Sequence, residues 1–302
     1  MPGLGIAGFL VVSQARRFSV PGILWMASYP KSGNTWLRAF LANYMKNPCA
    51  PMPIDELPQF VLGDGIAGPY EQVAGGPVDK MTVEEIQTLR PKVHEMFAWS
   101  SPDTVFVKTH NAISVLDGIP TITPDATAGA IYVVRNPLDV AVSYAHHYGI
   151  SYDRAITAMA SEDSVAPMHG NQIHQYLGSW STHVRSWAKA PGLKCHVIRY
   201  EDMTHKPEKT WRALIKFLDL PLETPRLKKA IKFSAFKVLA KQEKEDGFVE
   251  AVPLDDRVFF RKGKTGAWRK ELTADEVKRV VDRHGEVMAE HGYLNDKGKP
   301  RF

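Results

Sequence analysis

Short apolar runs alternate along the chain with longer segments in which apolar residues recur every three to four positions. The apolar runs lie at residues 23–27, 104–110, 130–137 and 195–202. Runs of this length, bounded by turn residues, are typical of buried strands, and the segments between them favour amphipathic helices. The alternation predicts an α/β fold with a parallel central sheet, in which ligands gather at the carboxyl ends of the strands.

Helical segments follow most of these runs, and two of them open on a sequence of the form T-x-x-E. Thr82 with Glu85, and Thr273 with Glu276, have this spacing, which is typical of a capping box at a helix N-terminus. Helices are expected at residues 34–45, 82–98, 139–148, 172–189, 206–218, 225–230 and 273–290.

Three further segments lack clear periodicity. Residues 47–77 are rich in proline and glycine, and residues 151–171 are polar and mixed. A loop as long as 47–77 inside a compact domain is usually functional, for example as the wall of a pocket. The run KQEKEDGF at residues 241–248 is expected to be a charged, mobile loop.

The pattern predicts one domain, because no internal repeat and no linker interrupts it. We expect a single three-layer domain at residues 23–302 and an N-terminal arm at residues 1–22. The apolar residues 6–12 are too few to span a bilayer, and the arginines follow them instead of preceding them. This order favours a surface arm over a signal peptide.

Composition adds only mild constraints. Hydrophobic residues make up 44% of the 302 residues and charged residues 24%, values of an ordinary globular protein that argue against disorder. The 38 Lys and Arg residues against 33 Asp and Glu residues favour an anionic ligand, but no basic run is long enough to predict nucleic-acid binding. The two cysteines, Cys49 and Cys195, form neither a disulfide framework nor a zinc pattern, which favours a reducing cytoplasm.

The first candidate site is the stretch SYPKSGNTW, which follows the first apolar run. Ser32, Gly33, Asn34 and Thr35 lie where a strand turns into a helix, so their backbone N–H groups can converge on an anion. Lys31 adds a full positive charge. This lysine precedes the glycine, whereas in the usual P-loop the lysine follows it.

Two later segments carry further cations. The strand at 130–137 ends in Arg135, where a P-loop enzyme would often place the aspartate that holds Mg²⁺, so an anion site without a metal is expected. Ser143 lies about two helical turns further on and could share that anion. The segment RKGKTGAW supplies Arg261 and Lys262 beside Gly263, a composition that suits a loop folding over a phosphate.

Taken together, these segments resemble those of cytosolic-type sulfotransferases, which use 3′-phosphoadenosine 5′-phosphosulfate (PAPS) and release adenosine 3′,5′-bisphosphate (PAP). YPKSGNTW resembles the family's 5′-phosphosulfate loop YPKSGTTW, RNPLDVAVSYAHHYG its 3′-phosphate segment, and RKGKTGAW its RKG-x-x-G-D-W loop. The motifs occur in the family's order. The resemblance implies a P-loop-like sulfotransferase domain that transfers a sulfuryl group to a hydroxyl of a small-molecule or lipidic acceptor.

The resemblance also implies roles for individual residues. His110, at the end of the strand motif KTH, would be the general base, and Lys108 would lie near the transferred group. Lys31 would contact the bridging oxygen, with no metal required. The donor would be bound by Lys31, Ser32, Gly33, Asn34, Thr35, Trp36, Arg135, Ser143, Tyr200, Ser234, Phe236, Arg261, Lys262 and Gly263.

Some positions depart from the family pattern. Asn34 replaces a threonine, and we expect its amide to donate to a phosphate instead; Ala267 replaces the aspartate of G-D-W, which would loosen that loop. The family's dimer segment is not matched around Thr273, so the oligomeric state stays open. Segments 47–77 and 151–171 are expected to wall the acceptor site, whose ligand the sequence does not identify.

Two other functions would require different sequence features. A P-loop phosphotransferase would need a lysine after the glycine-rich loop and an aspartate for magnesium, and both are missing from these motifs. A nucleotide-binding protein without catalysis would be expected to lack Lys31 or His110, and both are present. The sequence therefore favours an enzyme.

Overall fold

The structure is a computed structural model, and it describes residues 22–248, 250, 258–261 and 263–302. At its centre is a five-stranded sheet with the strand order β2-β3-β1-β6-β9, in which every neighbouring pair is parallel. Residues 1–21 of the expected N-terminal arm lie outside the described residues. The strands are β1 Ile23–Ser28, β2 Leu62–Gly63, β3 Val105–Thr109, β6 Thr127–Val134 and β9 Cys195–Arg199.

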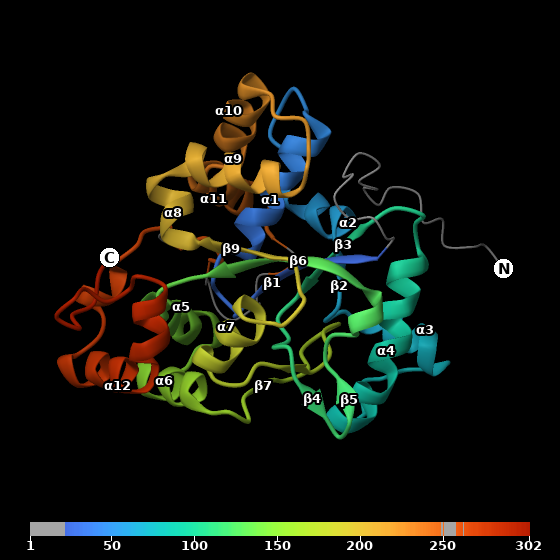
Figure 1. Cartoon of the computed structure of the whole chain (residues 1–302), viewed down its shortest axis with the longest axis horizontal. Coiled ribbons are helices and arrows are strands. Elements are labelled where there is room, and N and C mark those ends of the chain that lie inside the picture. Colours follow the sequence, from blue (N-terminus) through green and yellow to red (C-terminus); the bar gives the residue numbers. More distant parts are fainter. Residues whose placement is uncertain (1–21, 249, 251–257, 262) are drawn as a thin grey trace.

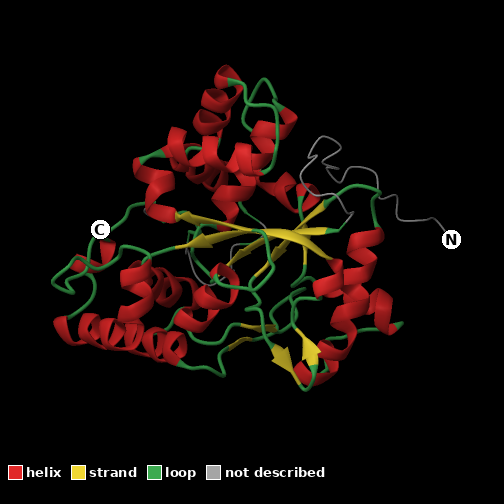
Figure 2. Ribbon diagram, in the orientation of Figure 1, coloured by secondary structure: helices red, strands yellow, loops and turns green. Residues whose placement is uncertain are grey.

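Helices cover both faces of this sheet (Figures 1 and 2). Alternate residues of β1 point to opposite faces, as the pleat of a strand requires. Trp25 belongs to a core formed with α4 (Val83–Trp99), α5 (Pro137–Tyr148), α7 (Trp180–Ala188) and α12 (Ala274–Glu290). Leu24 and Met26 belong to a second core formed with α1 (Asn34–Lys46), α9 (Pro207–Phe217) and α10 (Thr224–Phe233). The expected three-layer α/β fold is confirmed.

Most predicted helices are present at nearly the predicted bounds, and both capping boxes form at Thr82 and Thr273. The segment expected at 172–189 is helical only in its last part, as α7. These helices are α1 Asn34–Lys46, α4 Val83–Trp99, α5 Pro137–Tyr148, α7 Trp180–Ala188, α9 Pro207–Phe217, α10 Thr224–Phe233 and α12 Ala274–Glu290.

Three segments differ from expectation because tertiary packing orders them. The charged segment 241–248 is not a loop in its first part, since α11 Phe236–Asp246 runs through it and buries Leu239. Residues 47–77 contain η1 Ile54–Glu56, α2 Leu57–Phe60, the edge strand β2 and α3 Ala67–Ala74. Residues 151–171 contain α6 Tyr152–Ala160 and β7 Val165–Ala166, which pairs with β8 Gln175–Tyr176.

The remaining elements are short. The turn after β9 continues as α8, which the sequence pattern did not predict, and η2 leads into β6. Their bounds are α8 Tyr200–His205, β4 Val115–Leu116, β5 Ile119–Pro120, η2 Pro124–Ala126 and η3 Ala267–Lys270.

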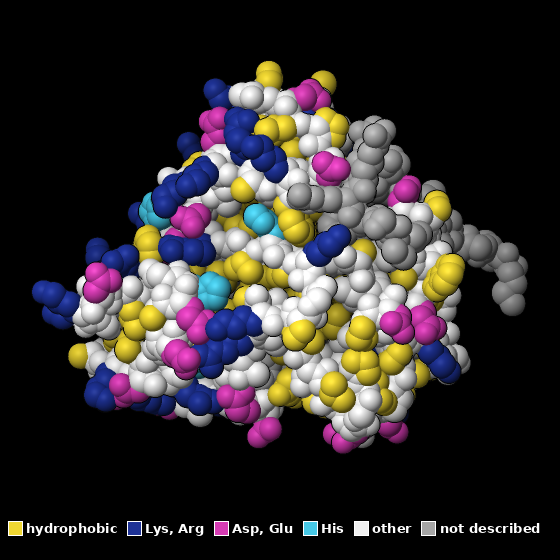
Figure 3. Space-filling model, viewed as in Figure 1, with side chains coloured by type: hydrophobic (Ala, Val, Ile, Leu, Met, Phe, Trp, Pro, Cys, Tyr) yellow, Lys and Arg dark blue, Asp and Glu magenta, His cyan; other side chains and the backbone are white. Residues whose placement is uncertain are grey.

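The surface mixes charges of both signs. On the face in Figure 3, Lys and Arg side chains are interspersed with Asp and Glu side chains. Several oppositely charged surface side chains of the protein form ion pairs, such as Arg279 with Asp153 at 2.5 Å. Among the described residues, no helix combines the length and the apolar character needed to cross a membrane.

Candidate active site

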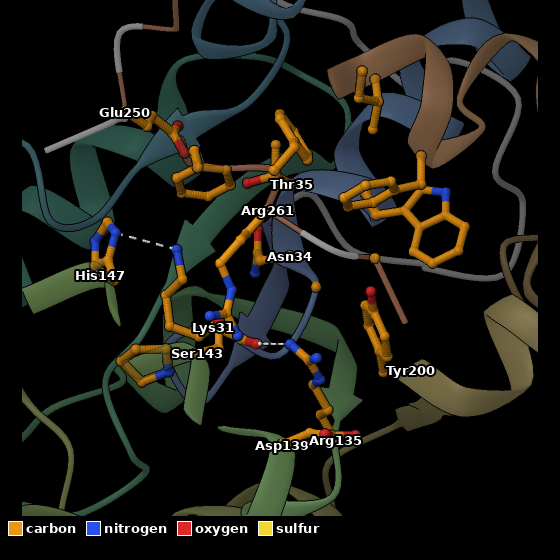
Figure 4. A pocket seen from close by; sticks show the side chains of 18 of the residues that line it. Lys31, Asn34, Thr35, Arg135, Asp139, Ser143, His147, Tyr200, Glu250 and Arg261 are labelled. Carbon is orange, nitrogen blue, oxygen red and sulfur yellow. Dashed lines mark hydrogen bonds between the residues drawn. The ribbon is translucent and has the colours of Figure 1, made fainter. Parts of the chain in front are cut away.

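A cavity that is open to solvent lies at the carboxyl ends of β1, β3 and β6 (Figure 4). It brings together most of the residues that the sequence indicated. Those that line it are Lys31, Gly33, Asn34, Thr35, Trp36, Lys108, His110, Arg135, Ser143, Tyr200, Phe236, Arg261 and Gly263.

The donor loop, residues 30–35, makes a tight turn between β1 and α1. Lys31 has a φ of 65° and Gly33 a φ of 108°, so both adopt backbone conformations with positive φ. A Cβ atom on Gly33 would come 2.7 Å from the ring of Tyr200, so only glycine fits there. The turn leaves the first N–H groups of α1 without helical partners, which is the arrangement that binds anions.

Arg135 fastens this loop to the end of β6. Its Nη1 donates to the carbonyl oxygen of Lys31 at 2.9 Å, and its guanidinium lies 4.3 Å from the ring centre of Tyr200. The buried Nε of Arg135 has no hydrogen-bond partner among the described residues. An orphaned donor of this kind in a cavity fits an anionic ligand, because a bound phosphate would satisfy it.

Asn34 does not use its amide as the sequence suggested. The buried side-chain nitrogen donates to the carbonyl oxygen of Met26 at 2.8 Å and lies 3.4 Å from Ser28 Oγ. The side-chain amide of Asn34 therefore holds α1 against β1. The backbone N–H of Asn34 is then the group that could donate to an anion at the helix N-terminus.

His110 is held in one tautomer. Its Nδ1 lies 2.7 Å from the carbonyl oxygen of Ser28, which can only accept, so Nδ1 carries the proton and Nε2 keeps its lone pair. The backbone N–H of His110 donates to Gln175 Oε1, and its carbonyl accepts from His183 Nε2, both at 2.9 Å. Burial, together with the charge of Lys108, holds the pKa of His110 well below its ordinary value, so the ring is neutral near pH 7.

Lys108 faces an ion pair that the sequence pattern did not reveal. Arg38 is buried on α1 and donates to both carboxylate oxygens of Glu250, at 2.8 and 2.6 Å. Lys108 Nζ lies 3.9 Å from the same carboxylate. Arg38, which lies among the apolar residues of α1, was the available signal, since a buried charge requires a partner.

Asp64, also missed, anchors the carboxyl end of β3, where Lys108 and His110 lie. Its fully buried carboxylate accepts from Thr109 Oγ1 at 2.7 Å, Arg90 Nη1 at 3.1 Å and His94 Nε2 at 2.9 Å. Because Thr109 lies between the two proposed catalytic residues, Asp64 fixes where β3 ends. Despite desolvation, the charge of Arg90 holds the pKa of Asp64 well below its ordinary value.

Asp139 performs a similar task for the late loop, residues 263–268. Its carboxylate accepts from the backbone N–H groups of Gly266 at 2.7 Å and Trp268 at 3.2 Å. The loss of the family's aspartate at Ala267 therefore does not leave the loop without an acidic anchor. Gly263 packs so closely on Phe236 that a Cβ atom would come within 2.3 Å of that ring.

Not every predicted residue reaches the cavity. Ser234 is buried at the end of α10, where its hydroxyl donates to the Ala230 carbonyl at 2.8 Å, and Ser32 is buried beneath the donor loop. Neither lines the cavity, and Lys262 lies outside the described residues.

The expectation that 47–77 and 151–171 wall the acceptor site stays a prediction. None of the residues that line the cavity comes from 47–77 or from 151–171, because those segments fold into packed helices and strands. The lining is supplied instead by His147, Tyr148, Gln172 and Phe259. No group of three or more His, Cys, Asp or Glu side chains among the described residues could hold a metal ion.

Comparisons with known proteins agree with this geometry. Residues 21–292 match the family model described as the sulfotransferase domain. Mouse sulfotransferase 1B1 is 26% identical over 268 residues, which cover 86% of this chain and 80% of the relative. Flavonol 3-sulfotransferase of Flaveria bidentis is 25% identical over 276 residues, covering 86% and 80%.

Solved structures share the fold. Retinol dehydratase in complex with androsterone and inactive cofactor PAP superimposes with a TM-score of 0.60 at 17% identity, covering 89% of this chain and 81% of the other. Mouse sulfotransferase SULT7A1 complexed with PAP gives a TM-score of 0.55 at 20% identity, covering 95% and 93%. The chain is therefore a sulfotransferase and belongs to the PAPS-dependent, cytosolic-type sulfotransferase family.

Proposed function

We propose that the protein transfers the sulfuryl group of PAPS to a hydroxyl of a small-molecule or lipidic acceptor, with His110 as general base. One observation carries the proposal: a histidine held as the Nδ1–H tautomer shares a cavity with a lysine-bearing anion loop. The free Nε2 is then available to accept a proton from the acceptor hydroxyl.

The donor would occupy the part of the cavity between the donor loop and the late loop. The 5′-phosphosulfate would bind at the helix N-terminus beside Lys31, and the 3′-phosphate near Arg135 and Ser143. Trp36 and Tyr200, whose ring centres are 5.5 Å apart, would contact the adenosine. Arg261, Gly263 and Phe236 line the same region and support this placement.

The reaction follows from where charge develops. The acceptor oxygen forms a bond to sulfur as its proton passes to His110 Nε2. The bond from sulfur to the bridging oxygen breaks, and the electron pair stays on the 5′-phosphate of the departing PAP. Lys31 would stabilise that negative charge. Such stabilisation is effective because the lysine is already held beside the bridging oxygen before the charge develops.

The acceptor end of the cavity is mixed in character. Gln172 and His147 present polar groups there, and Tyr148 and Phe259 present rings. Retinol dehydratase, which shares this fold, was crystallised in complex with androsterone and in a complex with retinol, and these two apolar ligands support the proposal of a small-molecule or lipidic acceptor. We propose a hydroxyl acceptor and a cytoplasmic location, with residues 23–302 as the single catalytic domain.

Transfer of radiolabelled sulfate from PAPS tests the function. A panel of phenols, sterols, alcohols, sugars and amines would be assayed with and without EDTA, with His110→Ala as the catalytic control. We expect labelled product from at least one hydroxyl acceptor, unchanged by EDTA and abolished in the variant. PAP binding without transfer to any acceptor would favour a nucleotide-binding protein, and EDTA-sensitive phosphate transfer from ATP would favour a phosphotransferase.

A further inference from the structure

His147 lies against Lys31 on the acceptor side of the cavity. The Nδ1 atom of His147 is 3.2 Å from Lys31 Nζ, and the same ammonium lies 3.7 Å from the ring centre of Phe259 (Figure 4). His147 is in the last turn of α5, edge-on to Phe259 at 5.9 Å and to Tyr148 at 4.8 Å between ring centres. These ring contacts fix the imidazole beside the lysine.

The chemistry of the two groups sets the direction of this hydrogen bond. Burial, together with the charges of Lys31 and Lys108, lowers the pKa of His147 to about 3, so its imidazole is neutral. A neutral imidazole can accept at Nδ1, whereas an ammonium has three donors and no lone pair. Lys31 therefore donates and His147 accepts, and this bond favours the charged form of the lysine.

The pKa of Lys31 is subject to opposing influences in this site. Desolvation, Arg135 and Lys108 lower the pKa of Lys31 to about 7, while the carboxylates of Glu250 and Glu243 raise it. Near neutral pH the ligand-free protein would hold a mixture of ammonium and amine. Only the ammonium can stabilise negative charge on a bridging oxygen, so a group that favours it assists the reaction.

We propose that His147 is a positioning residue: it accepts a hydrogen bond from the Lys31 ammonium and keeps that ammonium charged beside the donor loop. The inference rests on the proposed function, because it assigns Lys31 to the phosphosulfate end of the donor. It goes beyond that function by adding a second histidine, which acts through the lysine and not on the acceptor.

Calorimetric titration with PAP tests the role without requiring an acceptor. Titrations at pH 7 in two buffers with different ionisation enthalpies give the number of protons taken up on binding. Because the pKa of Lys31 is about 7, the wild-type protein should take up about half a proton as the lysine becomes fully charged. His147→Phe removes the acceptor and adds an apolar ring, so uptake should rise toward one proton.

The loss of PAP affinity in His147→Phe, relative to the wild-type protein, should increase with pH. If His147→Phe lowers the pKa of Lys31 by about one unit, binding weakens roughly twofold at pH 6, fivefold at pH 7 and tenfold at pH 8. A change in shape alone would weaken binding equally at each pH. His147→Asn, whose amide oxygen can stand where Nδ1 was, should restore the wild-type profile.

Two further variants complete the design. His146→Phe alters the adjacent, exposed histidine and should bind PAP as the wild type does, and Lys31→Met should abolish the proton uptake. Thermal unfolding of each variant would verify its fold. Equal proton uptake in His147→Phe and wild type would overturn the role of His147 alone, whereas failure of wild type to bind PAP would overturn the proposed function as well.

Discussion

The imidazole Nδ1 of His110 donates a hydrogen bond of 2.7 Å to the carbonyl oxygen of Ser28, the last residue of the central strand β1. This contact leaves Nε2 as the basic atom and ties its position to the same strand that carries the donor loop. The proposed base is thus held to the backbone of the strand from which the proposed donor loop extends.

His110→Ala should therefore remove proton transfer and leave donor binding intact. Loss of a general base typically costs about 10²- to 10⁴-fold in turnover, so transfer of label should fall by that factor. PAP affinity, measured by calorimetry, should remain within about twofold. His169→Ala, at an exposed position that does not line the cavity, is the matched control. Full turnover in His110→Ala would exclude it as the base.

The pH profile should show an alkaline limb and no acidic limb near pH 6. His110 has a pKa well below its ordinary value, so it remains a base as the pH falls toward 6. Lys31, with a pKa of about 7, loses its charge as the pH rises, so kcat/KM for the donor should decline above pH 7. Initial rates from pH 5.5 to 9 would measure this, and a rise in kcat/KM between pH 6 and 7 would contradict the assignment.

Asp64→Asn should destabilise the protein severely. The variant leaves Arg90 buried without its counter-charge, a change that typically costs about 3–5 kcal/mol in the free energy of unfolding. Because the folded pKa of Asp64 lies below its unfolded value, its stabilising contribution is complete above about pH 4 and is lost as the pH falls further. Urea unfolding at pH 7 and pH 3 would measure both effects. A variant as stable as wild type at pH 7 would exclude this role.

Asp139→Ala should weaken donor binding by releasing the late loop. Two backbone N–H groups lose a charged acceptor, each hydrogen bond being worth about 1.5–3 kcal/mol, although loop relaxation will recover part of this. We expect PAP affinity to fall at least tenfold, measured by calorimetry. Asp153→Ala, which removes an exposed carboxylate paired with Arg279, should leave the affinity unchanged. Equal affinities in the two variants would show that the loop does not depend on Asp139.

The parts of the fold that the sequence predicted are those controlled by local signals. Periodicity located β1 and α1, and the capping boxes at Thr82 and Thr273 located two helix starts to the residue. The charged helix α11 was missed because one buried apolar residue, Leu239, is too weak a periodic signal. The two-residue strand β2 was missed because only pairing with β3 defines it.

The same distinction applies to the site. Lys31, Arg135 and His110 lie in contiguous motifs next to strand ends, so sequence alone placed them together. Asp64 acts on Thr109 from 45 positions away, and Glu250 acts on Arg38 from 212 positions away. Such pairs form only when the chain folds, so the spacing of residues in the sequence does not predict them.

Gly33, Tyr200 and Arg135 form a stack with a consequence for ligand selection. The Tyr200 ring fills the space that a side chain at position 33 would need, and the Arg135 guanidinium lies over that ring. The Tyr200 ring thus lies between Gly33 and Arg135, the two places beside which the proposed function puts the 5′-phosphosulfate and the 3′-phosphate. Because this ring fixes the separation of the two proposed phosphate sites, a nucleotide with one phosphate would contact only one of them and should bind less tightly than PAP.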